Sequence, residues 1–417
     1  MDRNLLPTVV VFGNRVGIVK GETGGGSLFR ASMLKSLAQC FETEAFSIGL
    51  TEVDSVETCR GPLMTTSFQN MVRVWKMVRK TDGVILSGSW TGLSAWCCLL
   101  CRLYGAACIN IMTMNSSQAA GINFSGFLWV LVYCLYIASD WLNCLLACSA
   151  WTRSYTYLKE LRNMGMPVAG VAELNDQYTP FMREDTAEDI HSARLFLSCG
   201  QPEKPLLLFA GRIIKEKRIP LLIAARPPGT VLAIVGSGAL SDEIMQFHDP
   251  DNGIVCHVSS IVSQDVLRVY YKAADIHISA STFETLGNTV HESLLCGTAV
   301  VVQNAGGYIS QVKNGRNGYL VEWENVSEAQ GAMDNVLKGK LTSVKPMKDS
   351  ASSVLTIVDK AIKDPFAGQF KIIYHLTTLL AIPFVLMYLI FCSLYDVLTT
   401  VAIHTEDTID ASSNACA

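Results

Sequence analysis

Two carboxylates and two cations in the second half of the chain have the types and order needed to hold a ligand. In the stretch FETLGNTVHESLLCGTAVVVQNAGG, Glu284 and Glu292 lie eight positions apart. Arg212 and Lys217 come earlier, just after an apolar run typical of a β-strand. Carboxylates repel phosphate but accept hydrogen bonds from hydroxyl groups, whereas arginine and lysine can hold a diphosphate. The four residues therefore favour a ligand with an anionic middle and hydroxyl groups at both ends, such as a nucleotide sugar.

A predicted helix start lies between the two glutamates. Leu286, Gly287 and Asn288 open this helix, and the first amides of a helix have no intrahelical acceptor and bind phosphate well. Each residue also has a purely structural interpretation: the cations as surface charges, and the glutamates as a helix-start acid and a solvated helix residue. The ordered combination at strand ends is what favours ligand binding.

Alternating strands and helices must position these residues. Apolar runs predict buried strands, each followed by a helical pattern, at Thr8–Asn14, Gly83–Ser89, Pro205–Arg212, Val231–Gly238 and Ala274–Ser281. Repeated βα units imply parallel sheets that bind ligands at the carboxyl ends of their strands. The predicted class is therefore α/β, with two Rossmann-like domains that face a cleft.

The predicted domain boundaries follow polar and proline-containing stretches. We expect, in order, an acceptor-side domain at 1–178, a linker at 179–204, a nucleotide-sugar donor domain at 205–345, a return or linker segment at 346–370, a transmembrane helix at 371–396 and a short tail at 397–417.

Composition excludes some classes of protein. The 417 residues carry a net charge of −4, so bulk electrostatics give no reason to expect a nucleic-acid partner. The fourteen cysteines lie inside apolar runs, which favours buried free thiols in a reducing compartment. One C-x-x-C pair, Cys98 and Cys101, without a second pair is a weak zinc signal, and we expect no metal site.

The uncharged run IIYHLTTLLAIPFVLMYLIFCSLY, residues 372–395, predicts a membrane helix. At the α-helical rise it would reach roughly 36 Å, enough for a bilayer core. Lysines precede the run and acids follow it, which places the preceding domains on the cytosolic or stromal side. A buried core helix is the alternative. The start of the chain shows no secretory leader. A second apolar zone around 121–139 could also enter the membrane, but the sequence after it, from Asp140 on, fits a helix and strand packed in a domain better.

Three segments together resemble a known family. AGRIIKEK, VGSGALSDEI and ETLGNTVHESLLCGTAVVVQNAGGYISQVKNGRNGYLVE are similar to the donor domain of retaining glycosyltransferases of family four (glycosyl transferases group 1), which have the GT-B fold. The likeness is strong over 205–322 and fainter over 8–180. Within the family, ETLG and the segment order resemble sulfoquinovosyl-diacylglycerol synthases. Membrane-bound phosphatidylinositol N-acetylglucosaminyl- and mannosyl-transferases are also similar, and the sequence does not decide between them.

The resemblance implies roles residue by residue. Arg212 and Lys217 would hold the diphosphate, Glu284 the donor sugar and Glu292 the ribose. The amides of Leu286, Gly287 and Asn288 would bind phosphate. The glycines that approach the donor would be Gly24, Gly25, Gly26, Gly236 and Gly238. The family implies retaining transfer without a metal or another cofactor, from a nucleotide sugar such as a UDP-sugar. We expect a lipid acceptor in a bilayer, because a membrane-tethered domain meets head groups at high effective concentration.

One departure from the family opens an alternative. The family usually has a histidine after the fourth strand of the first domain, and this chain has Thr113 or Asn115 there. A hydroxyl or an amide can hydrogen-bond a sugar but cannot act as a base near neutral pH. The chain could therefore be a non-catalytic, membrane-anchored subunit that binds nucleotide sugars.

Two other enzyme classes fit less well. A metal-dependent transferase would use a D-x-D such as Asp249-Pro250-Asp251, but HDPDNG is predicted to be a polar turn rather than a strand end. A nicotinamide or flavin enzyme would need G-x-G-x-x-G, and here Ser241 replaces the last glycine.

Overall fold

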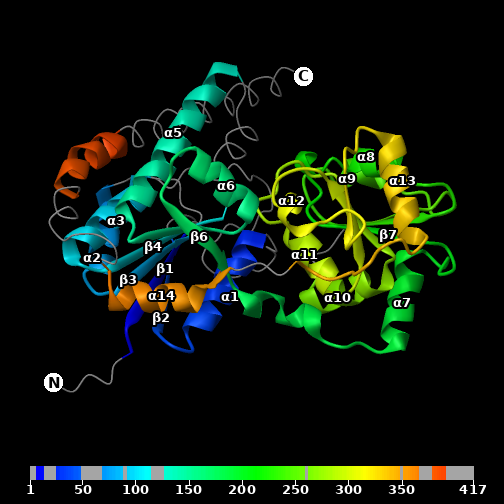
Figure 1. Cartoon of the computed structure of the whole chain (residues 1–417), viewed down its shortest axis with the longest axis horizontal. Helices are drawn as coiled ribbons and strands as arrows, with labels where there is room; N and C mark the ends of the chain where they lie inside the picture. The colour runs from blue at the N-terminus through cyan, green and yellow to red at the C-terminus, as the bar shows by residue number, and fades with distance from the viewer. Residues whose placement is uncertain are drawn as a thin grey trace, which may run out of the picture.

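Two parallel sheets organise the chain, one in each half (Figure 1). The computed structural model describes residues 6–13, 25–47, 68–87, 92–113, 126–258, 262–347, 351–365 and 378–390. Every predicted strand is present, and the three in the second half end two residues earlier than the sequence suggested.

The first sheet has the order β13-β6-β5-β4-β3-β1-β2, and all its strand pairs are parallel. Its strands are β1 Thr8–Gly13, β2 Glu42–Ser47, β3 Gly83–Ser87, β4 Ala107–Met112, β5 Ser149–Thr152, β6 Val168–Glu173 and β13 Ser352–Ser353. The helices that accompany it are α1 Gly25–Leu37, α2 Phe68–Val78, α3 Gly92–Tyr104, α5 Gly126–Leu146, α6 Tyr155–Asn163 and α14 Val354–Lys363.

The second sheet has the order β12-β11-β10-β7-β8-β9 and is also parallel. Its strands are β7 Leu206–Ala210, β8 Val231–Gly236, β9 Ile254–Val258, β10 Ile276–Ser279, β11 Ala299–Gln303 and β12 Gly318–Val321. Its helices are α7 Ala187–Leu197, α8 Ile219–Ala224, α9 Ser241–Met245, α10 Gln264–Ala273, α11 Asn288–Leu295, α12 Tyr308–Gln311 and α13 Val326–Leu337, with the short 3₁₀ helices η1 Asn175–Met182 and η2 Lys215–Lys217.

The strands read as unbroken apolar runs because both faces of each sheet are covered. In β7, Leu207 and Phe209 pack on one side of the sheet with α8 and α13, whereas Leu206 and Leu208 pack on the other with α7 and α10. In β3, Ile85 packs on one side of the first sheet, whereas Val84 and Leu86 pack on the other. Two layers of helices therefore enclose each sheet, as the repeated βα pattern predicts.

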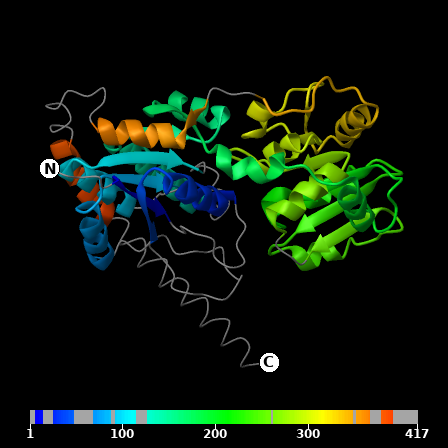
Figure 2. The ribbon, with the colours of Figure 1, turned by 90° about the horizontal axis from the view of Figure 1, so that it is seen from below.

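The chain crosses between the domains twice (Figure 2). It first crosses at η1, and α7 then packs on the second sheet through the buried Leu197. The segment predicted as a linker, 179–204, thus contains a helix of the second domain. After α13 the chain returns, β13 pairs with β6, and α14 buries Val354 and Val358 in the first core. Residues 352–363 of the predicted return segment, 346–370, therefore pack on the first domain.

The predicted membrane helix lies only partly within the described residues. Residues 378–390 are helical and bury Ala381, Val385 and Leu389 against α2 and α3, and the flanks 371–377 and 391–396 lie outside the described residues. In the part of the chain that the structure covers, no helix has the length and apolarity to cross a bilayer. The transmembrane helix at 371–396 therefore stays a prediction.

The sequence after the second apolar zone, from Asp140 on, belongs to a helix and a strand packed in the first domain, as the sequence favoured. Residues 126–146 form α5, which leads directly into β5, and Asp140 and Asn143 on this helix are buried. The Asn143 amide donates to Ser94 Oγ on α3 at 2.9 Å, so α5 packs into the first domain through polar as well as apolar side chains.

Candidate active site

The loops after β7 and β8 touch each other through backbone atoms. A Cβ on Gly236 would lie 1.9 Å from the carbonyl oxygen of Gly211, and one on Gly238 would lie 2.3 Å from that of Ile213. The amide of Ile213 donates to the Ser237 carbonyl at 2.8 Å. Gly236 and Gly238 are therefore required for loop packing, and their predicted approach to a donor stays a prediction.

The two predicted cations follow β7. Arg212 is exposed and has no ion-pair partner within the described ranges, so its guanidinium is available to a ligand. Lys217, in η2, forms an ion pair with Glu284, and both side chains are mostly buried, at 16% and 19% exposure. The structure thus brings together Lys217 and Glu284, which are 67 residues apart in the sequence.

Three glycines hold the loop that contains Glu284. Gly287 has φ of 82°, and a Cβ there would lie 2.4 Å from the ring of Tyr308. Gly306 and Gly307 pack directly on the backbone of 284–286, and the Gly307 amide donates to the Glu284 carbonyl at 2.6 Å. These contacts fix the approach to α11, which begins at Asn288 as the sequence predicted.

Glu292 faces the interior of the second domain. It is 4% exposed and accepts a hydrogen bond from the Tyr271 hydroxyl at 3.3 Å. Burial raises its pKa to about 7. Its predicted contact with a ribose stays a prediction.

The first-domain residues of the predicted site are only partly described. Gly25 and Gly26 form the start of α1, whereas Gly24 and Asn115 lie outside the described residues. Thr113 follows β4 and is half-buried. Which of Thr113 and Asn115 stands at the position of the expected imidazole stays a prediction.

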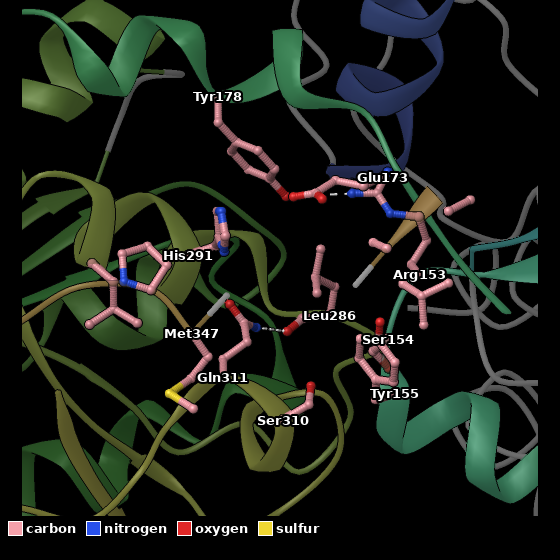
Figure 3. Close-up of a pocket in the computed structure, with 15 residues that line it drawn as sticks. Arg153, Ser154, Tyr155, Glu173, Tyr178, Leu286, His291, Ser310, Gln311 and Met347 are labelled. Carbon is pink, nitrogen blue, oxygen red and sulfur yellow. Dashed lines mark hydrogen bonds between the residues drawn. The ribbon is translucent and has the colours of Figure 1, made fainter. Parts of the chain in front are cut away.

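A pocket between the two domains contains functional candidates that the sequence reasoning missed (Figure 3). Arg153 directly follows β5 and Glu173 ends β6, so their place at the carboxyl ends of parallel strands was the signal that could have identified them. From the second domain, α11 contributes His291 and α12 contributes Gln311. The other lining residues are Ser154, Tyr155, Val171, Ala172, Tyr178, Leu286, Leu294, Ser310, Pro346, Met347 and Ala351.

Arg153 is the buried cation of this pocket. Its side chain stacks on Phe29 of α1, with Cζ 3.7 Å from the ring centroid, and Nη2 donates to Gln177 Oε1 at 3.3 Å and to the Tyr178 hydroxyl at 3.4 Å. The Tyr178 hydroxyl in turn donates to Asn288 Oδ1 at 2.9 Å. A chain of contacts therefore runs from α1 to the first residue of α11.

His291 is uncharged at neutral pH. Its ring centroid lies 4.4 Å from that of Tyr178. Burial, together with the positive charge of Arg153, lowers its pKa to about 4. This imidazole is therefore neutral, and it can donate a hydrogen bond to a ligand with one nitrogen or accept one with the other.

The alternative motifs have structural roles. Asp249 accepts from the amide of Asn252 at 3.2 Å and from its side chain at 2.6 Å, in a turn before β9. No cluster of metal-ligating side chains occurs within the ranges that the structure describes. The cysteines within the described residues are free thiols, most of them buried as expected, whereas Cys40, Cys134 and Cys199 are exposed.

Residues 200–352 match the sequence profile of the family described as Glycosyl transferases group 1. Over these residues the chain is similar to glycosyl transferases group 1. The matched residues contain the whole second sheet, the ion pair between Lys217 and Glu284, and the start of α11.

Curated relatives match about a third of the chain. Sulfoquinovosyl transferase SQD2 of Arabidopsis thaliana is 29% identical over 154 residues, which are 36% of this chain and 30% of that protein. The lipopolysaccharide core biosynthesis glycosyltransferase LpsE of Rhizobium meliloti is 30% identical over 131 residues, 31% of this chain and 37% of that protein. The chain thus aligns with about a third of the length of these relatives.

Solved structures match both domains. HepE of Anabaena, in complex with UDP and glucose, has a TM-score of 0.61 at 15% identity and covers 86% of this chain and 98% of its own. Sucrose-phosphate synthase of Thermosynechococcus elongatus has a TM-score of 0.59 at 17% identity, with 80% and 90% covered. At such identities the likeness concerns the fold alone, and the predicted GT-B fold with two Rossmann-like sheets is confirmed.

Proposed function

We propose that the chain is a retaining glycosyltransferase that moves a sugar from a nucleotide-sugar donor to an acceptor hydroxyl. One observation carries the proposal: an ion pair joins Lys217, five residues after the exposed Arg212, to Glu284, four residues before the start of α11, within the residues that match group 1. Cations, a carboxylate and free helix amides in one place suit a diphosphate flanked by hydroxyl groups.

In this mechanism the protein supplies the charge that stabilises the leaving group. The bond between the sugar and the diphosphate breaks while Arg212, Lys217 and the amides of 286–288 stabilise the developing negative charge. The acceptor hydroxyl attacks from the face that the diphosphate leaves, which retains configuration, and its proton passes to the departing diphosphate. Glu284 accepts a hydrogen bond from the donor sugar. Protein cations thus take the role that a metal has in other transferases.

A UDP-sugar is the donor that we propose. HepE, which shares the fold, has been captured with UDP and glucose and also with UDP-glucose. Calorimetry of the full chain with UDP, GDP and ADP tests this choice, because only the preferred nucleotide should bind tightly.

The site assignment is tested by removing the cations. We expect Arg212→Ala and Lys217→Ala each to weaken UDP binding about tenfold or more, since each loses a charge-assisted hydrogen bond to phosphate. Lys215→Ala is the matched control, because Lys215 is exposed in the same short helix. Wild-type affinity and transfer in both cation variants would contradict the assignment.

We also propose a lipid acceptor in a bilayer, with both domains on the cytosolic or stromal face. The uncharged run 372–395 supports it, as does the outer face of the helix at 378–390, which exposes Leu379, Leu380, Phe384, Met387 and Ile390. The similarity to sulfoquinovosyl transferase SQD2 makes sulfoquinovosyl or related glycolipid synthesis the first reaction to assay.

Two substitutions on this helix separate membrane contact from folding. Leu380 is 69% exposed, so Leu380→Asp should leave the melting temperature unchanged and reduce binding to phosphatidylcholine vesicles. Val385 is fully buried against the first domain, so Val385→Asp should lower the melting temperature by several degrees. Undiminished vesicle binding by Leu380→Asp would count against a membrane role for this face.

A non-catalytic subunit that binds nucleotide sugars is the second candidate. Thr113 or Asn115 stands where a histidine is expected, and neither a hydroxyl nor an amide can act as a base near neutral pH. Tight UDP binding without transfer to any lipid fraction would favour this candidate. Transfer that is reduced by Arg212→Ala would exclude it.

A further inference from the structure

Arg218 has a backbone conformation that residues with a side chain rarely adopt. Its φ is 49° and its ψ is 41°, in the left-handed region, and among the described residues only Cys199 shares a positive φ without being a glycine. This region brings Cβ close to a neighbouring carbonyl oxygen, so it is strained for every residue except glycine. Such strain persists only where the surrounding structure fixes the residue, and it clusters at functional sites.

The side chain of Arg218 connects four neighbouring strand ends. Arg218 itself lies in the loop after β7. Its Nε donates to the carbonyl of Ala280, which directly follows β10, at 2.7 Å. Its Nη2 donates to Gln303 Oε1 at the end of β11, and its Nη1 forms an ion pair with Glu324 after β12. Because β12, β11, β10 and β7 are consecutive neighbours in the second sheet, one guanidinium joins the loops of half its carboxyl edge.

The same loops hold the predicted donor residues. Lys217 directly precedes Arg218, and Glu284 lies in the loop that begins at Ala280. In the loop after β11, the Gly307 amide donates to the Glu284 carbonyl at 2.6 Å. The contacts of Arg218 therefore fix both loops that form the Lys217–Glu284 ion pair.

Arg218 is poorly placed to bind a ligand itself. All three of its guanidinium nitrogens already donate to protein acceptors, and its side chain is 22% exposed. A phosphate would have to displace Gln303 or Glu324 from it. Arg212, in contrast, is exposed and has no ion-pair partner within the described ranges. Any effect of Arg218 on a ligand should therefore pass through its neighbour Lys217.

We propose that Arg218 is a positioning residue of the donor site. Its backbone turns the chain directly after Lys217, and its guanidinium fixes this turn to the ends of β10, β11 and β12. The ammonium of Lys217 is thereby held beside Glu284, ready for the donor diphosphate. The inference rests on the proposed function and adds a residue that does not touch the substrate. A glycine would adopt the same turn without strain but would lack the three contacts.

The first test replaces Arg218 by that glycine. Arg218→Gly keeps the turn and removes the contacts, so UDP should bind about fivefold or more weakly to the full chain by calorimetry. Cys199→Gly is the matched control, because it relieves the same strain, at φ of 51°, in an exposed position after α7. It should leave UDP affinity unchanged. Wild-type affinity in Arg218→Gly would overturn the proposal.

A second variant separates the geometry of the guanidinium from its charge. Arg218→Lys keeps a positive charge and a long side chain, but one ammonium group cannot reproduce the planar fork that contacts three partners. We expect it to lose about as much UDP affinity as Arg218→Gly. Wild-type affinity in Arg218→Lys would show that a charge at this position is enough, and it would refute the positioning role.

A double-mutant cycle shows whether Arg218 acts through Lys217. Calorimetry compares Lys217→Ala with the double variant that also carries Arg218→Gly, well below the melting temperature of each. Once the ammonium is absent its position no longer matters, so the two should bind UDP within about twofold of each other. A purely structural effect would weaken binding by the same factor in both backgrounds, and that result would overturn the proposal.

The same measurements separate this inference from the proposed function. If the wild type binds neither UDP, GDP nor ADP, the proposed function itself fails. If UDP binds and Lys217→Ala weakens it while Arg218→Gly does not, the donor site stands and the role of Arg218 is wrong.

Discussion

The second-domain edge of the pocket is fixed by backbone contacts at glycines, whereas the first-domain edge depends on one buried side chain, Arg153. Gly306 and Gly307 pack on the backbone beside Glu284, and Gly287 packs on Tyr308. On the other edge, Arg153 connects Phe29 with Tyr178 through side-chain contacts alone. At these glycines any side chain would clash with neighbouring atoms, so a substitution must move the loop. A substitution in a side-chain contact can instead remove one interaction and leave the others in place. Changes on the two edges should therefore differ in size.

The largest effect is expected at Gly287. Alanine there needs φ of 82° and puts its Cβ 2.4 Å from the Tyr308 ring, so the loop must move. Gly287→Ala should abolish measurable UDP binding and lower the melting temperature.

Gly297 is the matched control for that change. It has the same φ of 82° but nothing within 4 Å of an added Cβ. Gly297→Ala should cost about 1 kcal/mol of backbone strain and leave UDP affinity unchanged. Equal losses in the two variants would show that strain, and not the contact with Tyr308, fixes the loop.

Asp185→Asn should have a smaller effect, and it tests whether the region after η1 packs on the second domain. Asp185 forms ion pairs with Arg268 at 2.7 Å and with Lys272 at 2.7 Å, both on α10. Hydrogen bonds from Arg268 hold the pKa of Asp185 well below its usual range. Asp185→Asn leaves two cations without their partner and should lower the melting temperature by several degrees.

The matching control is Asp265→Asn. Asp265 contacts the same Arg268 but is 62% exposed, so its loss should change the melting temperature little. UDP binding by the folded protein should survive both changes, since neither residue is part of the donor site. Loss of UDP binding in Asp185→Asn at temperatures where it is folded would contradict a purely structural role.

The next prediction concerns pH. The folded pKa of Glu292 is raised by burial to about 7 from an ordinary value of 4.5, so the folded chain holds an extra proton between these values. The contribution of Glu292 to stability is therefore present at pH 4.5 and is lost as the pH rises toward 7. Relative to Glu292→Gln, the wild type should melt progressively lower from pH 5 to pH 8.

The difference in melting temperature between the wild type and Glu292→Gln reports the titration of Glu292 alone. His277 and His291 have pKa values lowered to about 4 and act in the opposite direction, but they are present in both proteins. Thermal melts of the wild type and of Glu292→Gln at matched pH values measure the difference. A constant difference across the range would show that Glu292 does not titrate there.

The smallest effect is expected where the two edges meet. Tyr178→Phe removes the 2.9 Å hydrogen bond to Asn288 and the longer one from Arg153, while the ring stays. We expect UDP affinity to fall about fivefold, because one neutral hydrogen bond that positions the start of α11 is lost. A loss as large as that of Gly287→Ala would mean that side chains, like the backbone, fix the donor loop.

The donor-side residues could be predicted from the sequence because they lie in short contiguous motifs. Glu284, Gly287 and Glu292 share one stretch, and Arg212 and Lys217 share another, each directly after an apolar run that forms a buried strand. The interior position of Glu292 was not foreseen, because periodicity does not show which partner a helix face meets. The polar composition of the predicted linker, 179–204, hid the helix α7.

The sequence by itself determined two parallel βα domains and a cluster of donor-type residues, because strands buried on both faces need continuous apolar runs and loops at strand ends need glycine. Only the tertiary structure decided that Lys217 pairs with Glu284, that Arg153, Glu173 and Gln311 share one pocket, and that the helix at 378–390 packs on α2 and α3. These residues come from separate strands and helices, and their proximity depends on how the two sheets and the return segment are placed. No local pattern in a chain records that placement.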